Sequence, residues 1–514
     1  MLVRRGGPQA VWRGLAFGLG LVLLTLIVAV ATLFSSGAPF LSIWLVLLVF
    51  GAIGAGVLVL APQASAGIER FGFGLLVFFV FATVLWPRYA GFRLPGMPSF
   101  SLSRLSLLAL LIVGMYLLAK GPAFRQRLQE RAAQFRVVIY PVLLLILWKL
   151  VASVASEYPV IAVRAWLNDV LSTFAPLFIA LGVVQTRNDV HKLVAAFVAS
   201  ALLVGLLGLL EWRLGHNLFA GILQVDSEYL EQVLREKLRG DGARLQSTFS
   251  HPLTLSEFMV LVTPVTVYWA FSQGFRWLRA LALLALLCLF AVIVAKTGSR
   301  SGIGTYVLVL GLLAPAMLLR RYKLARHSVA AALNLLVAIA IVCIGLVAVY
   351  FVLDIVVGRT AAEQSSSLVR LRMWEAGLAK AAVSPLLGYG QDIGGQVLGF
   401  VGNYGVLTLD SSYLSYLLDG GFPSLILFAF VLLALVGLGL RHGLAQAEPD
   451  LLALALAASV FGFALIKGVL SLPHNHGLVM VLVSCMLVSI ADRLRTLQVV
   501  QPAAHPRRFG LRHP

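Results

Sequence analysis

The chain has 514 residues, of which 60% are hydrophobic and 12% are charged, and its mean hydropathy is +0.95. This composition excludes a soluble globular domain with an ordinary polar surface, so the sequence predicts a polytopic membrane protein. The 40 Lys and Arg residues exceed the 21 acidic residues by a net charge of +19, which is typical of loops beside anionic lipid, and nucleic-acid binding is not expected.

Apolar stretches of about 17–25 residues, long enough for a helix to cross a bilayer, occur about fourteen times. The first follows Arg4 and Arg5 and has no convincing cleavage site, so we expect an uncleaved first helix. With a cytoplasmic N-terminus, nearly every short loop obeys the positive-inside rule, and the C-terminus is also cytoplasmic. The expected spans are 15–34, 41–62, 71–86, 101–119, 137–155, 166–185, 191–210, 253–271, 278–295, 302–318, 328–353, 421–440, 451–470 and 475–491.

Two outer loops are much longer than the others, and both are predicted to be structured. In the first, apolar residues recur at helical spacing over 229–238, which indicates an amphipathic helix on the membrane surface. In the second, a helical pattern around 371–379 ends before Pro385. The expected segments are N-terminal transmembrane helices (1–210), a first outer loop (211–252), further transmembrane helices (253–353), a large outer loop (354–420), C-terminal transmembrane helices (421–491) and a basic tail (492–514).

Ionisable residues inside the predicted spans all lie in the outer halves of their helices. A charge at the centre of a bilayer costs about 2.5 kcal/mol or more, so such residues normally face a polar cavity or a partner. Their grouping predicts a polar chamber that opens outward. For Lys149 and Lys467, the alternative is that the long side chain reaches the lipid headgroups. The residues are Lys149, Asp169, Glu257, Lys296 and Lys467.

Four groups of short motifs follow one another on the predicted outer face. They are Arg244-Leu245-Gln246-Ser247-Thr248-Phe249-Ser250-His251-Pro252, Lys296-Thr297-Gly298-Ser299-Arg300-Ser301-Gly302, Arg370-Leu371-Arg372-Met373-Trp374 with Pro385-Leu386-Leu387-Gly388-Tyr389-Gly390, and Asp410-Ser411-Ser412-Tyr413-Leu414 with Gly420-Gly421-Phe422-Pro423. Their order and spacing resembles the O-antigen ligase and Wzy-type polymerase family of bacterial membrane glycosyltransferases, over about 240–440. The N-terminal helices are similar only in number and hydropathy.

The resemblance implies an all-α, GT-C-like membrane protein whose active site lies on the periplasmic face of the bacterial inner membrane. It also implies a polyprenyl (undecaprenyl) diphosphate-linked glycan as donor, with C1 of the sugar attacked by a hydroxyl of an acceptor glycan or glycolipid. Membrane lipid, a chain-length regulator and a flippase are the other partners that it implies. No cofactor is expected.

Arginines are suited to such a donor because guanidinium groups bind phosphate bidentately, without a metal, as negative charge grows on the leaving group. The resemblance places Arg244, Arg300 and Arg370 at the diphosphate, with Arg372 and Lys296 as further candidates. Arg370 ranks above Arg372 because residues two apart on a helix point to different faces. Anchoring to lipid headgroups, or ion pairs that hold the loops together, is the alternative.

Asp410 is the first candidate base for the acceptor hydroxyl. Many ligases of the resembled family carry a histidine at this place, so the aspartate favours a polymerase over a ligase. The alternative role for Asp410 is a helix N-cap. Glu257 is a second candidate base, and its alternative is to pair with Arg244 or Lys296.

Three further residues, Trp374, Tyr413 and His251, are candidates for binding the acceptor or the glycan. Trp374 shares a helix face with Arg370. Core packing is the alternative for Trp374. No metal site is expected, because His474 and His476 have no converging ligands in the sequence. Metal-dependent oligosaccharyl transferases of the related superfamily typically carry acidic motifs in the outer loop that follows their first helix, and the corresponding short loop here, 35–39, has no acid. A metal-independent transfer is therefore predicted, and the reaction expected from the resemblance proceeds with inversion. A flippase or transporter is the alternative, although such a protein would carry charges in the inner halves of its helices too.

Overall fold

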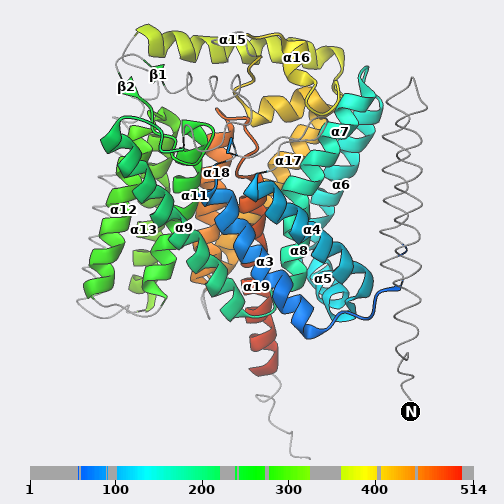
Figure 1. Ribbon diagram of the computed structural model, residues 1–514, viewed down its shortest axis with the longest axis vertical. Coiled ribbons are helices and arrows are strands. Elements are labelled where there is room, and N and C mark those ends of the chain that lie inside the picture. Colours follow the sequence, from blue (N-terminus) through cyan, green and yellow to red (C-terminus); the bar gives the residue numbers. More distant parts are fainter. Residues whose placement is uncertain are drawn as a thin grey trace, which may run out of the picture. The chain divides into compact units, whose positions relative to one another are not determined.

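The computed structural model describes residues 56, 60–87, 89–90, 101–219, 238–239, 242–272, 277–324, 361–401, 407–445 and 450–500 (Figure 1). Two-residue strands β1 (Leu238–Arg239) and β2 (Gly242–Ala243) pair antiparallel, and the other elements described are helical. The helices are α3 (Ala66–Leu85), α4 (Leu102–Lys120), α5 (Pro122–Gln134), α6 (Arg136–Val154), α7 (Pro159–Asp169), the π-helical turn η1 (Val170–Phe174), α8 (Ala175–Val183), α9 (Arg187–Leu214), α11 (Pro252–Phe271), α12 (Trp277–Lys296), α13 (Arg300–Leu324), α15 (Ala361–Val383), α16 (Gly394–Leu398), α17 (Ser412–Gly443), α18 (Leu451–Lys467) and α19 (His476–Val500).

Among the described helices, nine segments are long and apolar enough to cross a membrane, and Arg300–Leu313 of α13 and Leu451–Lys467 (α18) are shorter apolar segments. They correspond to the predicted spans from 71–86 onward except 328–353, so the prediction of an all-helical, multi-pass membrane protein is confirmed. The expected spans 15–34 and 328–353, and most of 41–62, lie outside the described residues. The amphipathic helix expected over 229–238 also lies outside them, apart from Leu238 in β1.

The chain divides into two compact units, Met1–Phe71 with Ile112–Gln126 and Gly72–Leu111 with Arg127–Pro514. In the smaller unit, the Ala64 N–H donates to the Lys120 carbonyl at the end of α4 (2.8 Å). All candidate site residues belong to the larger unit.

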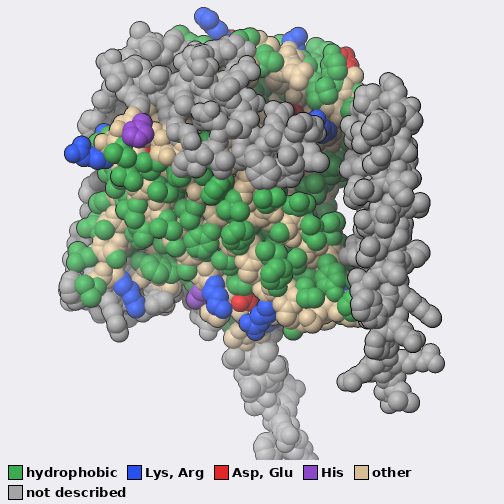
Figure 2. All heavy atoms as spheres, in the orientation of Figure 1, with side chains coloured by type: hydrophobic (Ala, Val, Ile, Leu, Met, Phe, Trp, Pro, Cys, Tyr) green, Lys and Arg blue, Asp and Glu red, His purple; other side chains and the backbone are tan. Residues whose placement is uncertain are grey.

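Helix α18 lies at the centre of the larger unit, in contact with α11, α13, α17 and α19. Glycines allow these neighbours to approach closely, as is common between helices in membranes. A Cβ atom added at Gly439 of α17 would lie 2.6 Å from the Cβ of Ala457, and one at Gly462 would lie 3.0 Å from side chains of α11 and α13. Around this core, the visible middle of the unit is covered mainly by hydrophobic side chains, and Lys and Arg lie toward its rims (Figure 2).

The π-helical turn η1 joins α7 and α8 into one span, Pro159–Val183. Pro176 lacks an N–H, and its ring would clash with the carbonyl of Ser172 in a regular helix, which accounts for the irregular turn. Gly477 in the first turn of α19 packs against this turn. A Cβ atom there would lie 2.5 Å from the Ser172 carbonyl oxygen, so a larger residue does not fit.

Segments predicted to lie outside the membrane meet at one end of the larger unit, where α15 and α16 lie across the ends of the upright helices (Figure 1). Ser412 Oγ donates to the Leu470 carbonyl (2.8 Å), and the Leu245 N–H donates to the Lys296 carbonyl (3.1 Å). Each bond joins two predicted outer segments. Segments that the hydropathy pattern puts on the same side of the membrane are therefore in contact in the structure.

Segments predicted to be cytoplasmic meet one another in the same way. Arg131 of α5, which is 1% exposed, donates through Nη1 to the carbonyls of Leu181 and Val184 at the end of α8 (2.5 and 2.6 Å). Arg493 Nη1 donates to the His442 carbonyl at the end of α17 (3.0 Å). Cations placed on C-terminal carbonyls stabilise helix ends, so these contacts close the bundle at its predicted cytoplasmic end.

Helix α17 is interrupted at Gly420 and Gly421, the boundary at which the sequence predicted that the outer loop ends. Gly421 has φ +70° and ψ −173°, and the helical segment before the break begins at Ser412, inside the predicted loop. Pro423 follows the break at a position where a helix start tolerates proline. The break leaves the carbonyls of residues 418–420 without their helical partners.

Donors from elsewhere in the chain satisfy these carbonyls. The N–H groups of Tyr389 and Gly390 donate to the carbonyls of Leu418 and Asp419 (2.8 and 2.9 Å), and Trp148 Nε1 donates to the Gly420 carbonyl (2.8 Å). Broken helices in a membrane require such replacement partners. The motif at 385–390 therefore completes the interrupted helix.

Glycine is required at the break for two reasons, and both predict that Gly421→Ala is destabilising. The positive φ disfavours a side chain, and a Cβ atom would lie 2.2 Å from the Leu386 carbonyl oxygen. We expect a loss of roughly 2 kcal/mol or more, measured as a lower Tm of the purified protein in nanodiscs. Gly437→Ala in the same helix is the matched control, because nothing lies within 4 Å of its added Cβ. It should be neutral or stabilising, and equal Tm values for the two variants would contradict the prediction.

Candidate functional site

An open hollow lies at the predicted outer end of the larger unit. Helix α15 forms one wall of it, the start of α17 forms another, and the residue that follows α18 completes it. The lining residues are Arg370, Met373, Trp374, Asp410, Ser411, Leu414 and Gly468.

The two charged residues of the hollow face each other. Arg370 Nε lies 3.3 Å from Asp410 Oδ2, and the two side chains are 30% and 40% exposed. A partly exposed pair of this kind contributes about 0–1 kcal/mol to stability. Both side chains are therefore accessible from outside the bundle.

Helix α15 presents its residues as the sequence predicted. Arg370 and Trp374, one turn apart, both line the hollow, whereas Arg372 is exposed on another face. The same face of α15 packs on α17 one turn further along, where Gly377 is needed because a Cβ atom would lie 2.5 Å from Leu414 Cδ1. This packing fixes the rotation of α15 about its axis and with it the direction of Arg370.

Asp410 is not the N-cap of α17, contrary to the alternative considered for it. Ser411 is the N-cap, and its Oγ accepts the Leu414 N–H (3.4 Å). Asp410 therefore remains available to Arg370. Tyr413, a candidate for glycan binding, donates a hydrogen bond from its hydroxyl to the Ala464 carbonyl of α18 (2.9 Å), which joins two helices. Its ring packs on Phe428 of α17.

A second group of candidates surrounds the short connection between α12 and α13. Arg244 Nε donates to the Thr297 carbonyl (2.7 Å), and Gly298, with φ +63°, leaves room for that side chain, since a Cβ atom would lie 3.2 Å from Arg244 Nε. Arg300 begins α13 directly after this turn and, like Arg244, is half-buried. Lys296 holds its ammonium 4.3 Å from the centre of the Trp212 ring. The first two arginine motifs are thus brought together.

His251 caps α11 rather than facing the hollow around Arg370. Its Nδ1 accepts the Leu253 N–H (3.1 Å). Burial of the ring, and then the charge of Arg244, lower the pKa of His251 from 6.5 to about 4. The imidazole is therefore neutral at physiological pH, as a hydrogen-bond acceptor requires.

Glu257 forms an ion pair with Lys467, not with Arg244 or Lys296 as considered from the sequence. Glu257 Oε1 lies 2.8 Å from Lys467 Nζ, and both side chains are 0% exposed. Lys149 and Asp169 form a second buried pair, between α6 and α7. The charges in the outer halves of the spans thus mostly find partners inside the bundle. Because a charge is costly inside a membrane, it normally faces either a polar cavity or a partner, and here the partner is observed.

The connection between α18 and α19, residues 468–475, was not among the predicted site residues. It contributes Gly468 to the hollow, and its Asn475 donates to Glu257 Oε2 (2.8 Å). His474 Nε2 lies 2.6 Å from Ser250 Oγ, beside the Arg244 motif. The signal in the sequence was Lys467 at the end of an apolar helix, followed within a few residues by His474 and Asn475.

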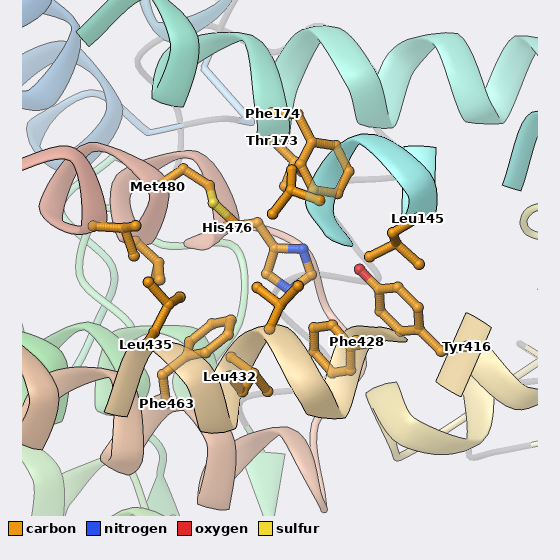
Figure 3. A pocket seen from close by; sticks show the side chains of 14 residues that line it. Leu145, Thr173, Phe174, Tyr416, Phe428, Leu432, Leu435, Phe463, His476 and Met480 are labelled. Carbon is orange, nitrogen blue, oxygen red and sulfur yellow. The ribbon is translucent and has the colours of Figure 1, made fainter. Parts of the chain in front are cut away.

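A separate hollow lies inside the bundle, between α6, η1, α17, α18 and α19, and its lining is mostly apolar (Figure 3). His476 points into it together with Tyr416 and Phe463. Among the described residues, His476 Nε2 has no hydrogen-bond partner although the side chain is only 6% exposed. No predicted catalytic residue lines this hollow.

In the described part of the chain, no group of three or more His, Cys, Asp or Glu residues is arranged to hold a metal ion. The charged and aromatic groups that line the hollow are the Arg370 guanidinium, the Asp410 carboxylate and the Trp374 ring. Such a set can bind an anionic leaving group and accept a proton from a hydroxyl.

Comparison with protein families gives one match, between residues 280–429 and the family described as O-antigen ligase. The matched region runs from α12 into α17 and includes Arg300, Arg370 and Asp410. It leaves out Arg244 and the 468–475 connection. Comparison with curated proteins gives no match.

The pKa of His251 predicts how stability depends on pH. The folded-state pKa of about 4 lies below the unfolded value of 6.5, so the unfolded chain binds a proton first as the pH falls. The contribution of the neutral His251 side chain to folding stability is present in full above pH 6.5 and is lost as the pH falls from 6.5 to about 4. Asn, a favoured N-cap that does not titrate, should preserve the helix start and remove this part of the pH dependence. The measurement is Tm against pH for wild type and His251→Asn, and parallel curves would refute the prediction.

Proposed function

Since residues 280–429 match the O-antigen ligase family, we propose that the chain is a polysaccharide polymerase of the bacterial inner membrane. It transfers glycan repeats from a polyprenyl-diphosphate donor to the hydroxyl of an acceptor glycan, on the periplasmic face, and serves O-antigen or exopolysaccharide assembly. Both termini are cytoplasmic. The observation that carries the proposal is the exposed Arg370–Asp410 pair in a hollow lined by Trp374.

In the proposed reaction, the acceptor oxygen attacks C1 of the donor sugar with inversion. The bond between C1 and the phosphate oxygen breaks, and the lipid diphosphate leaves with the electron pair. The acceptor proton passes to the Asp410 carboxylate. No metal and no cofactor takes part.

Arg370 is suited to the leaving group because only its Nε is directed to Asp410. A guanidinium has further N–H groups on its two Nη atoms, and these can bind diphosphate oxygens while Nε keeps the carboxylate oriented. The same residue then stabilises the charge that develops as the bond breaks. Arg244 and Arg300, which lie around the 296–300 turn, are assigned to the rest of the diphosphate, with Lys296 and Arg372 at its margin.

Trp374 is assigned to the acceptor sugar, because an aromatic ring on the wall of an open hollow offers a face on which a sugar can stack. Tyr413 and His251, which are also assigned to the acceptor, support helices α17 and α11 through their hydrogen bonds.

A ligase is the second candidate, and the description of the matched family favours it. Its acceptor would be lipid A core or another terminal acceptor rather than a lipid-linked glycan. Asp410 in place of the histidine of many ligases is the reason for preferring the polymerase.

Turnover by the purified protein in nanodiscs tests the proposal. With a polyprenyl-diphosphate oligosaccharide, wild type should produce longer lipid-linked glycans and release lipid diphosphate. Arg370→Ala and Arg244→Ala should lower kcat by about 10²–10³-fold, and Asp410→Asn by about 10²–10⁴-fold, with Tm preserved. Lys380→Ala, an exposed residue on α15 outside the hollow, is the matched control. If wild type gives no transfer but moves the donor between leaflets, the protein is a transporter.

Glycan chain lengths in a deletion strain separate the two transferases. Loss of every product longer than one repeat is expected for a polymerase. Free lipid-linked polymer that is not transferred would show a ligase instead. Complementation with Asp410→Asn should leave the deletion pattern unchanged, because the proton acceptor is missing.

A further inference from the structure

The buried pair between Glu257 and Lys467 makes hydrogen bonds beyond itself. Lys467 Nζ also donates to the Leu472 carbonyl (2.7 Å), and Glu257 Oε2 accepts from Asn475 Nδ2 (2.8 Å). Both additional partners belong to the 468–475 connection. A buried ion pair is weak evidence for stability, because apolar residues of similar volume often serve as well. The bonds to the connection indicate another purpose.

The opposite side of the connection holds the segment that carries Asp410. Ser412 Oγ donates to the Leu470 carbonyl (2.8 Å), and Ser471 Oγ donates to the Leu409 carbonyl. These bonds fall on both sides of Asp410 in the sequence. Gly468, at the start of the connection, lines the hollow itself.

The connection is also attached to the start of α11, next to the Arg244 motif. Asn475 Nδ2 donates to the Thr254 carbonyl (2.9 Å), and Ser250 Oγ lies 2.6 Å from His474 Nε2. One stretch of eight residues therefore contacts both the segment with the candidate base and the segment with a candidate diphosphate ligand.

We propose that Glu257 and Lys467 are positioning residues that fix the 468–475 connection and, through it, hold Asp410 in register with the Arg244 motif. The Glu257 carboxylate has both oxygens engaged and is 0% exposed, so it does not reach an acceptor hydroxyl. We call the Glu257–Lys467 pair and its hydrogen bonds to the 468–475 connection the clamp. Its role in catalysis rests on the proposed function, whereas its structural role is only to hold the connection and the 409–412 segment in place.

The charge-swapped double variant, Glu257→Lys with Lys467→Glu, separates positioning from stability. It restores an ion pair, but the carboxylate introduced at 467 cannot donate to the Leu472 carbonyl and the ammonium introduced at 257 cannot accept from Asn475. We expect the swap to recover most of the Tm lost in Lys467→Met. Amide hydrogen exchange in 468–475 and 409–412 should nevertheless rise at least about tenfold. The kcat for transfer should fall about 10–100-fold with little change in donor KM, as misplacement of a reacting group predicts.

The other buried pair provides the matched control. Lys149→Asp with Asp169→Lys makes the same exchange of charges between α6 and α7, where the ion pair joins neither segment of the clamp. It should leave exchange in 468–475 and 409–412 as in wild type. Equal loosening by the two swaps, or wild-type exchange in the Glu257 and Lys467 swap, would overturn the proposal.

If the swapped protein does not fold, Asn475→Leu decides the matter. It keeps the ion pair and removes only the bonds from position 475 to Glu257 and Thr254. Faster exchange in the two segments with lower kcat supports the clamp, and wild-type values of both overturn it. If wild type itself shows no transfer, the proposed function fails, while the exchange comparison still decides whether the clamp exists.

Discussion

Every polar group of the backbone inside the bundle must find a partner there, because lipid supplies none. At the break in α17 this requirement joins distant parts of the chain. The carbonyls freed at Leu418, Asp419 and Gly420 take their donors from 389–390 and from Trp148. The segment after α15 is thereby fixed on the end of the bundle. Since Arg370 lies on α15 and Asp410 lies just before α17, the hollow between them depends on this pairing.

The glycine motifs and the charged motifs of the outer face have different roles. Gly388 and Gly421 sit at positive φ where the chain turns against other backbone, and Gly390, also at positive φ, turns against the side chains of Ser156 and Ala162, so these glycines explain how the outer segments are seated. Arg370 and Asp410 remain partly exposed, and the proposed reaction assigns them to the substrate. The motifs of the resemblance, which the family match supports over residues 280–429, therefore combine a framework with an exposed ion pair.

Much of this arrangement is accessible from the sequence, for identifiable reasons. Hydropathy predicts the spans because their length is imposed by the bilayer, and helical spacing correctly puts Arg370 and Trp374 on one face. The cap of α17 was ambiguous because Asp410 and Ser411 are both good capping residues, and only the backbone geometry shows that Ser411 acts. The pairing of Glu257 with Lys467 spans more than two hundred residues, and no local pattern encodes it.

The bond from Trp148 to Gly420 bears on what counts as a domain in this protein. The region that matches the family ends at residue 429, within α17, and a fragment cut to 280–429 would lack Trp148. The Gly420 carbonyl would then be left in an apolar setting without its donor, a cost of about 1–3 kcal/mol. The matched segment thus depends on a hydrogen-bond donor from outside its own limits. Exchanging it between related proteins would require that the recipient bring a donor of its own to the same carbonyl.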